Sequence, residues 1–373
     1  MHNKDNKKQR IVVGISGGVD SAVSAHILKK QGHEVIGLFM RNWDSLLNNE
    51  LNNENLANIC PQEQDYLDAK KVCQELGIEL IRKDFVKEYW DYVFSYFLDE
   101  FKANRTPNPD IFCNKYIKFS AFADYALNEL KADAIAMGHY AQINFNQTTK
   151  EYQLLKGIDV NKDQSYFLSQ LTQEQLKKTI FPIGNLTKPE VRKIAKALNL
   201  SVANKKDSTG ICFIGERNFK NFLDNYLPAK PGKTVDIATN QVIGSHDGVY
   251  YYTLGQRKGL NLSGFKKSYF VVDKDAQNNI LYVANENDWL MADNCLINNI
   301  NWISNNKPKT INCFAKFRYR QNDIPVTINF INDTEAIVQS DEAVRAITPG
   351  QIAAFYLNDV CLGSGIVNTI IKK

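Results

Sequence analysis

A cysteine at position 113 stands where a thiol could act as a nucleophile. It lies in "NRTPNPDIFCNKYIKF", residues 104–119, where two prolines fix an extended turn and Asp110 can cap the helix that follows. A thiol in the first turn of a helix, with Lys115 close by in sequence, is expected to have a lowered pKa and to be a better nucleophile. Asp110 is three residues from Cys113 and would share its helix face.

A second polar turn holds another cysteine of the same kind. "KKDSTGICFIGER", residues 205–217, surrounds Cys212 with lysines, an aspartate and an arginine, so cations lie beside a potentially exposed thiol. Four other cysteines stand in apolar stretches and are expected to be small buried hydrophobes: Cys73, Cys295, Cys313 and Cys361.

A third reactive stretch is "GISGGVDSAVSAHILKK", residues 14–30, which follows the apolar run "RIVVGI". The run predicts a buried parallel strand, and apolar residues at helical spacing predict a helix after it. Backbone N–H groups at a helix N-terminus bind anions, and Gly17 and Gly18 let the backbone approach closely, so we expect a phosphate site. The stretch is neither a Walker A loop nor a dinucleotide fingerprint, because the required Gly-Lys-Ser/Thr and G-x-G-x-x-G patterns are missing.

The order S-G-G-x-D-S resembles the pyrophosphate loop of the N-type ATP pyrophosphatases. That resemblance implies that ATP is split between its α and β phosphates and that the loop holds the pyrophosphate. Asp20 would help to hold Mg²⁺, and no other metal ligand is expected. The resemblance makes these residues the ATP-binding loop: Gly14, Ile15, Ser16, Gly17, Gly18, Val19, Asp20 and Ser21.

Two positions outside the loop are assigned to the nucleotide by topology. Met40 ends the apolar run "GLFM", and Gly138 ends "AIAMGHY". Carboxyl ends of parallel strands gather at one edge of a sheet, where an adenine and ribose could lie beside the loop.

The elements that must position these residues change character along the chain. Short apolar runs alternate with amphipathic stretches up to about Ala203, which predicts a doubly wound parallel sheet with helices on both faces. Beyond Lys230, turns alternate with β-branched and aromatic residues, which predicts a small β domain and then a C-terminal β-barrel. The fold class is therefore α/β, with domains expected at 1–210, 211–280 and 281–373.

Composition limits the class of protein. The 373 residues are 44% hydrophobic and 23% charged, which is typical of a soluble chain of two or three domains. We expect no membrane segment and no secretory signal, because no apolar run is long enough and the N-terminus is polar. Seven cysteines without a Cys-x-x-Cys pair favour reduced thiols in the cytoplasm. A net charge of +4 neither requires nor excludes nucleic acid.

Blocks along nearly the whole chain resemble the bacterial tRNA-specific 2-thiouridylases. The most specific are "NPDIFCN" and "DSTGICFIGER", which other pyrophosphate-loop enzymes do not share. Further blocks appear in order: "GISGGVDS", "GLFMRNW", "MGHY", "KDQSYFL", "KPEVRKIA", "TLGQRKGL", "YFVVDKD", "FRYRQNDIP" and "ITPGQ".

This resemblance implies a reaction and its partners. ATP would adenylate the C2 oxygen of the wobble uridine in the tRNAs for Glu, Gln and Lys, and sulfur would replace that oxygen. Cys212 would carry a persulfide loaded by a cysteine desulfurase or a sulfur-relay protein. Cys113 would attack Cys212, leaving a disulfide, while Asp110 serves as general acid or base.

The resemblance also implies residues that touch RNA. Asn108, Pro109 and Asp110 would contact the target base, and the tRNA would be contacted by Lys162, Asp163, Gln164, Arg318 and Tyr319. Taken alone, "FRYR" suits a solvated strand face as well as an RNA backbone with a stacked base. Two other functions stay open: a ligase that adenylates a small metabolite, and an RNA-binding protein with a degenerate nucleotide site.

Overall fold

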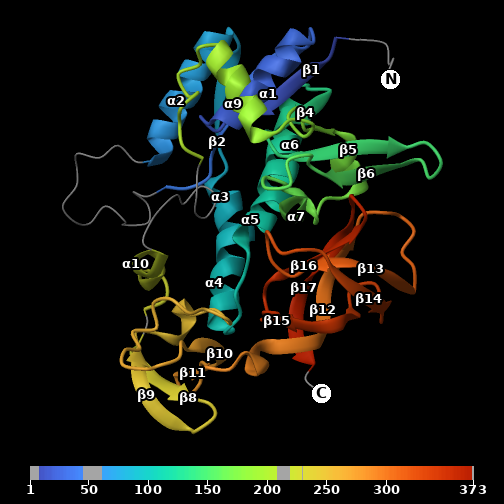
Figure 1. Ribbon diagram of the computed structural model, residues 1–373. Helices are drawn as coiled ribbons and strands as arrows, with labels where there is room; N and C mark the ends of the chain where they lie inside the picture. The colour runs from blue at the N-terminus through green and yellow to red at the C-terminus, as the bar shows by residue number, and fades with distance from the viewer. Residues whose placement is uncertain (1–7, 45–60, 208–218, 229, 372–373) are drawn as a thin grey trace.

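The computed structural model describes residues 8–44, 61–207, 219–228 and 230–371. These residues form three sheets in three parts of the molecule (Figure 1). Within the described residues, no helix is both long enough and apolar enough to cross a membrane.

The N-terminal part is built on a five-stranded sheet in the order β3-β2-β1-β4-β7, in which every pairing is parallel. Its strands are β1 (Arg10–Gly14), β2 (Glu34–Arg41), β3 (Glu79–Asp84), β4 (Ala134–Ala136) and β7 (Thr179–Ile180). Side chains alternate along β1: Ile11 and Val13 enter one buried cluster and Val12 another. The sheet is therefore buried on both faces, which explains why its strands are apolar runs.

Helices cover each face of this sheet, as predicted. One face carries α1 (Val19–Lys30), α2 (Pro61–Leu76) and α9 (Lys188–Ala197). The other face carries two long continuous helices that contain π-helical stretches. The first consists of α3 (Val86–Tyr89), η1 (Trp90–Phe94) and α4 (Ser95–Lys102). The second consists of α5 (Pro109–Phe112), η2 (Cys113–Ala121), α6 (Phe122–Asp124) and η3 (Tyr125–Glu129). Two short helices follow, α7 (Ser165–Leu168) and α8 (Gln173–Lys177).

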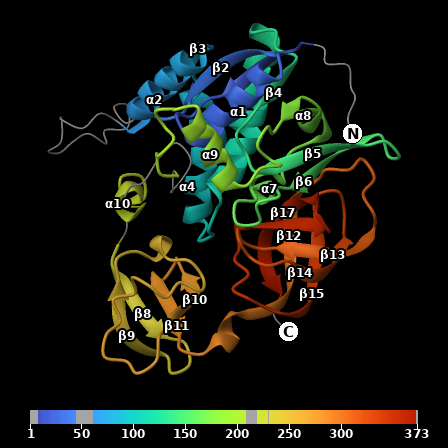
Figure 2. The ribbon, with the colours of Figure 1, turned by 45° about the horizontal axis from the view of Figure 1, so that its top comes forward.

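The small β part lies next to α10 (Phe219–Asp224) (Figure 2). Its four strands run in the order β10-β11-β8-β9 around a core that includes Val271 and Leu281. The elements are β8 (Gly232–Asp236), β9 (Gln241–His246), η4 (Val249–Tyr251), β10 (Phe270–Asp275) and β11 (Ile280–Ala284).

The C-terminal part is a β-barrel, as predicted, and its six strands pair antiparallel. Its elements are η5 (Asn287–Leu290), β12 (Met291–Trp302), β13 (Thr310–Lys316), β14 (Ile324–Phe330), β15 (Ala336–Arg345), β16 (Ile352–Leu357) and β17 (Val360–Ile371). The barrel closes because β12 pairs with both β15 and β17. A hairpin from the N-terminal part, β5 (Ala141–Asn146) and β6 (Glu151–Lys156), extends this sheet through the pair Val360–Leu155.

The segment before α5 is where all three parts meet. The Thr106 N–H donates to the Pro349 carbonyl of the barrel part at 2.9 Å. The Asn104 side chain donates to the Lys274 carbonyl of the small β part at 2.6 Å. The helix that begins at Pro109 is therefore positioned by contacts from both β parts.

Candidate functional site

The loop between β1 and α1 has the backbone of an anion site. Gly17 has φ +72°, and a Cβ there would lie 2.3 Å from the Asp65 carbonyl oxygen, so the position requires glycine. Gly18 is the N-cap of α1 and offers no side-chain cap. The N–H groups of the first turn are thus not satisfied by a cap and can meet a phosphate.

The two serines of the loop have different places. Ser21 is 5% exposed, and its hydroxyl accepts the Ser16 N–H at 3.2 Å and donates to the Gly18 carbonyl at 3.2 Å. Ser16 is exposed, with its Oγ 3.3 Å from that of Ser21. Ser21 therefore shapes the loop, while Ser16 presents a hydroxyl at its surface.

The positions assigned by topology border this loop. A Cβ on Gly14 would lie 2.6 Å from the Met137 sulfur and 3.7 Å from the Met40 methyl group. A Cβ on Gly138 would lie 2.8 Å from the Asp20 carbonyl carbon and from the Ser21 nitrogen. The ends of β2 and β4 thus meet the start of α1, whereas Ile15 and Val19 belong to the buried core.

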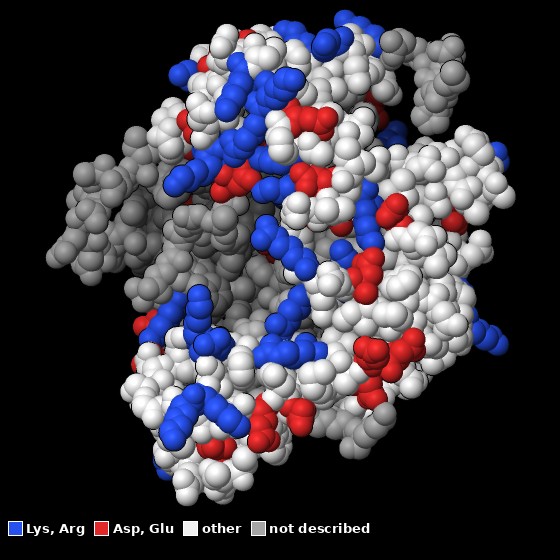
Figure 3. Space-filling view, in the orientation of Figure 1, with Lys and Arg blue, Asp and Glu red and all other residues white. Residues whose placement is uncertain are grey.

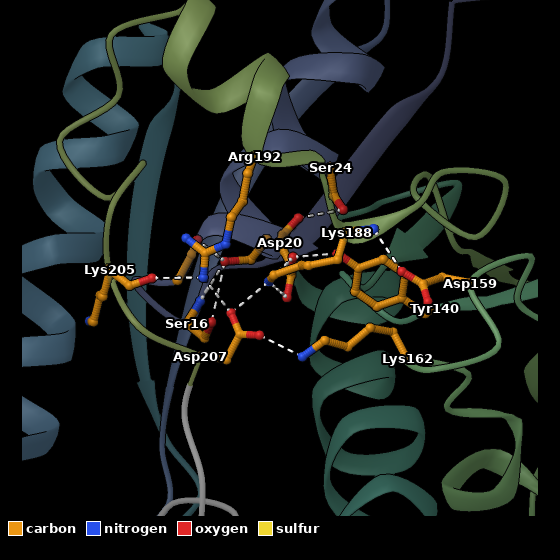
Figure 4. A network of polar contacts seen from close by, with 12 residues as sticks. Ser16, Asp20, Ser24, Tyr140, Asp159, Lys162, Lys188, Arg192, Lys205 and Asp207 are labelled. Atoms are coloured by element: carbon orange, nitrogen blue, oxygen red, sulfur yellow. Dashed lines mark hydrogen bonds and ion pairs between the residues drawn. The ribbon is translucent and has the colours of Figure 1, made fainter. Parts of the chain in front are cut away.

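Asp20 is held by donors that the sequence reasoning did not single out. Lys188, at the start of α9, donates to both carboxylate oxygens at 2.7 and 2.8 Å, and Tyr140 donates through its hydroxyl at 2.8 Å (Figure 4). A capping box fixes the start of α9, because Thr187 Oγ1 and N–H both contact Glu190 at 2.7 Å. The sequence "TKPE", residues 187–190, carries this signal, but the contact of Lys188 with Asp20 is set by tertiary packing.

Asp207 is a second carboxylate beside the loop, after Asp20, that gathers several cations (Figure 4). It receives Lys162 at 2.5 Å, Lys188 at 2.8 Å and Arg192 at 2.7 Å. Burial opposes ionisation of this carboxyl, but hydrogen bonds from Lys162 and Lys188 outweigh it and lower the pKa of Asp207 to about 2. Lys188 links the two carboxylates, since it contacts both Asp20 and Asp207.

Lys205 contacts the loop from the side of α2 and completes a ring of four cations around it, with Lys162, Lys188 and Arg192. Its ammonium donates to the Gly17 carbonyl at 3.0 Å, to Asp65 at 2.8 Å and to Asp68 at 2.6 Å. Cations therefore surround the phosphate loop. Each of them is paired with a carboxylate.

The block after Lys162 makes internal contacts. Asp163 is 8% exposed and accepts the Gly157 N–H at 3.0 Å and the Ser165 hydroxyl at 2.9 Å. Gln164 accepts the Tyr140 N–H through its side chain at 2.9 Å. In this structure both residues hold the turn that carries Lys162 and Tyr140.

The segment expected to meet the target base lies at the start of α5. Asn108 is its N-cap, Pro109 stands at its start, and Asp110 lies in its first turn. Cys113 follows at the beginning of η2 and is 0% exposed. The Lys115 ammonium points to the Gln170 side-chain oxygen at 3.0 Å, and burial lowers the pKa of Lys115. A lowered pKa for Cys113 stays a prediction.

The structure tests the predictions for four of the other cysteines. Cys212 lies outside the described residues. The four expected to be buried are buried, and burial raises the pKa of each thiol to about 12: Cys73, Cys295, Cys313 and Cys361. Those four thiols are therefore protonated at neutral pH and are poor nucleophiles.

Arg318 and Tyr319 connect the barrel with the rest of the molecule. The Arg318 guanidinium donates to the Leu254 carbonyl at 3.1 Å and to the Ala346 carbonyl at 2.6 Å, and burial lowers its pKa. The Tyr319 ring lies 4.4 Å from that of Phe167 in α7. Both side chains thus stand at the junctions between parts.

The loop can hold a nucleotide phosphate, and Asp20 is the carboxylate there that could bind magnesium. The described residues hold no cluster of three or more His, Cys, Asp or Glu suited to a metal. Asp20 is the carboxylate of the loop, and Lys188 already contacts both of its oxygens. Mg²⁺ could be held by Asp20 together with phosphate oxygens and water, which is how proteins usually bind this ion.

Family models match three consecutive segments of the chain. Residues 9–216 match the model described as tRNA methyl transferase HUP domain. Residues 220–285 match the tRNA methyl transferase PRC-barrel domain, and residues 292–367 match the aminomethyltransferase beta-barrel domain.

Curated relatives align along almost the entire chain. The tRNA-specific 2-thiouridylase MnmA of Mycoplasma capricolum subsp. capricolum is 59% identical over 374 residues, which cover 98% of this chain and 100% of that protein. The MnmA of Mesoplasma florum is 57% identical, with 97% and 100% covered. MnmA 1 of Geobacillus kaustophilus is 54% identical, with 98% and 97% covered. The chain belongs to the tRNA-specific 2-thiouridylase family.

Proposed function

We propose that this protein is a tRNA uridine 2-sulfurtransferase that uses ATP to replace the C2 oxygen of the wobble uridine by sulfur. The observation that supports this most directly is the ring of cations around the uncapped start of α1. Asp207, whose carboxylate pairs with three of these cations, stands five residues before Cys212 in the sequence. The segment that carries Cys212 is therefore attached directly to a residue beside the expected phosphate site.

ATP would supply the activation that the substrate needs. The C2 oxygen of uracil belongs to a urea-like carbonyl and is a poor leaving group until it is esterified. In the proposed reaction that oxygen attacks the α phosphorus, pyrophosphate departs, and the N3 proton that the uracil loses passes to Asp110 or to water. The N–H groups of the loop would bind the departing phosphates. Lys188, Arg192 and Lys205, which are already paired with carboxylates, would hold the residues around the loop in place. Asp20 would hold Mg²⁺ together with the phosphate oxygens.

Sulfur would arrive as a persulfide on Cys212. Its terminal sulfur attacks C2, and AMP leaves with the former uracil oxygen. The Cys113 thiolate then attacks the Cys212 sulfur, which breaks the S–S bond and leaves sulfur on the base. The product is 2-thiouridine and a Cys113–Cys212 disulfide, which an external thiol reductant must reduce. Asp110 is close enough in sequence to take the Cys113 proton. A cysteine desulfurase or a sulfur-relay protein would load Cys212.

The RNA would lie where the N-terminal part faces the two β parts. Lys and Arg side chains gather along both borders of that zone (Figure 3), as a phosphate backbone requires. Asn108, Pro109 and Asp110 would contact the base, and the tRNA would be contacted by Lys162, Asp163, Gln164, Arg318 and Tyr319. The proposed substrates are the tRNAs for Glu, Gln and Lys, which implies work in the cytoplasm.

A thiolation assay with matched cysteine variants tests this function. Purified protein receives ATP, Mg²⁺, a persulfide donor, a reductant and unmodified transcripts of the three tRNAs. Nucleoside mass spectrometry measures 2-thiouridine, and pyrophosphate is measured in parallel. We expect Cys113→Ser to release pyrophosphate without forming 2-thiouridine, because adenylation needs no thiol.

The control is Cys313→Ser, which changes a cysteine buried in the barrel, 6% exposed, and should thiolate like the wild type. A wild-type protein that makes no 2-thiouridine would contradict the proposal. Pyrophosphate release that depends on a small carboxylic acid, and not on tRNA, would point to the metabolite ligase.

A further inference from the structure

The side-chain amide of Asn42 is buried without partners. The residue is 0% exposed, and neither its Nδ2 nor its Oδ1 has a hydrogen bond. Among the described residues it is the one side chain in which both amide atoms are buried and unpartnered. Burying such a group costs free energy of a few kcal/mol, so native proteins rarely keep one without a use.

Both neighbours prevent Asn42 from turning out to solvent. The Arg41 guanidinium is fixed by ion pairs with Asp44 and Asp84, and the Arg41 carbonyl accepts the Phe85 N–H at 2.8 Å. On the other side, the Trp43 ring is 4% exposed and packs against several aromatic rings. The amide is therefore held in place before any ligand arrives.

The position of Asn42 links the nucleotide edge with the layer that carries α5. It follows the last residue of β2 at the carboxyl edge of the sheet, where ligands of such sheets bind. Met40 and Trp43, on either side of it in sequence, belong to the same buried cluster as Ile111 and Cys113. Asn42 therefore stands between two residues that pack in one cluster with the segment where the proposed function requires the target base.

We infer that Asn42 binds the uracil of the target uridine. Uracil offers one donor, N3–H, beside the acceptor O4, and an amide offers the complementary pair Oδ1 and Nδ2. Pairing along this edge leaves O2 uncovered, and O2 is the atom that must react. The inference rests on the proposed function and adds a substrate-binding residue to it. Adenine of ATP is the competing ligand, which the experiment separates.

The test uses Asn42→Leu, in which an apolar side chain of similar branching replaces the amide. Removing an unpartnered buried polar group should leave the melting temperature equal to or above that of the wild type. Loss of a two-bond contact to a base should lower kcat/KM for tRNA thiolation about 5- to 150-fold. The KM for ATP should stay within about twofold, because the amide does not touch the nucleotide. Asn42→Ala, which cannot overfill the site, should give the same pattern.

The matched control is Asn298→Leu in the barrel, where one unpartnered amide oxygen is removed away from the site. It should leave thiolation unchanged. The inference is overturned if Asn42→Leu thiolates with wild-type kcat/KM, if both Asn42 variants melt well below the wild type, or if the loss appears as a raised KM for ATP. A wild-type protein that makes no 2-thiouridine instead refutes the proposed function, and the inference falls with it.

Discussion

Lys188 is the side chain whose removal should most disturb the phosphate loop. It is 8% exposed and contacts the Asp20 and Asp207 carboxylates together. Lys188→Met keeps most of the aliphatic volume and removes the charge. The change therefore isolates the electrostatic role of the residue from its packing.

The expected loss of stability in Lys188→Met depends on how well the Asp20 and Asp207 carboxylates are compensated without the lysine. Removing one partner of a fully buried ion pair costs about 3–5 kcal/mol, because the other charge stays buried and uncompensated. The Asp20 and Asp207 side chains are 32% and 33% exposed, and each keeps another donor, Tyr140 for the first and Arg192 for the second. We therefore expect a loss of about 2–3 kcal/mol. For a domain of about 200 residues, this lowers the melting temperature by about 4–12 °C.

Thermal unfolding and pyrophosphate release measure the two consequences of Lys188→Met separately. The control is Lys196→Met, which removes an exposed lysine from the same helix and should change neither readout. In the double variant with Asp20→Asn, stability should recover by about 1–2 kcal/mol because the uncompensated charge is gone, while pyrophosphate release stays lost. A Lys188→Met protein that melts within 2 °C of the wild type, on the order of the shift for 1 kcal/mol, and releases pyrophosphate at the normal rate would refute this reasoning.

Two further predictions concern neighbours of the same loop. The pKa of Asp207 is lowered from 3.8 to about 2, so its ionised form stabilises the fold above pH 4 and this contribution disappears as the pH falls toward 2. With a third of the side chain exposed, the stability difference between wild type and Asp207→Asn should be about 1 kcal/mol at pH 7 and vanish near pH 2 in urea titrations; a constant difference would contradict the ion pairs. Gly138→Ala should push the Asp20 backbone away, costing about 1–3 kcal/mol and raising the KM for ATP. In the control Gly244→Ala, the new methyl group meets the flexible Leu262 side chain, and a similar ATP defect there would rule out a local cause.

The sequence predicted what is local to one stretch of chain. The order of Ser16, Gly17 and Gly18 after an apolar strand predicted the strand, the tight turn and the helix that the structure shows, because the three are contiguous in the chain. Lys188 and Arg192 could not be found in this way. They lie on α9, more than 160 residues beyond Asp20, and meet the loop because α9 packs on α1.

Exposure and strand pairing were the other properties that local sequence did not reveal. The segment of Cys113 is polar enough to predict a turn, yet its thiol is 0% exposed because it packs in the large buried cluster that also contains Ile111 and Ile117. Similarly, nothing in the 141–156 hairpin indicates that it extends a barrel formed by residues beyond 290. Pairing between distant strands depends on the whole fold.

The charges around the loop explain why a metal ion should accompany the nucleotide. Four cations in contact there, Lys162, Lys188, Arg192 and Lys205, are matched by four carboxylates, Asp20, Asp65, Asp68 and Asp207. The cluster is therefore close to neutral before ATP arrives, and the phosphates would bring an excess of negative charge. The protein's own cations do not remain to balance it, because each already has a partner. A divalent cation bound between Asp20 and the phosphates would offset part of this excess, so we expect pyrophosphate release to depend on magnesium.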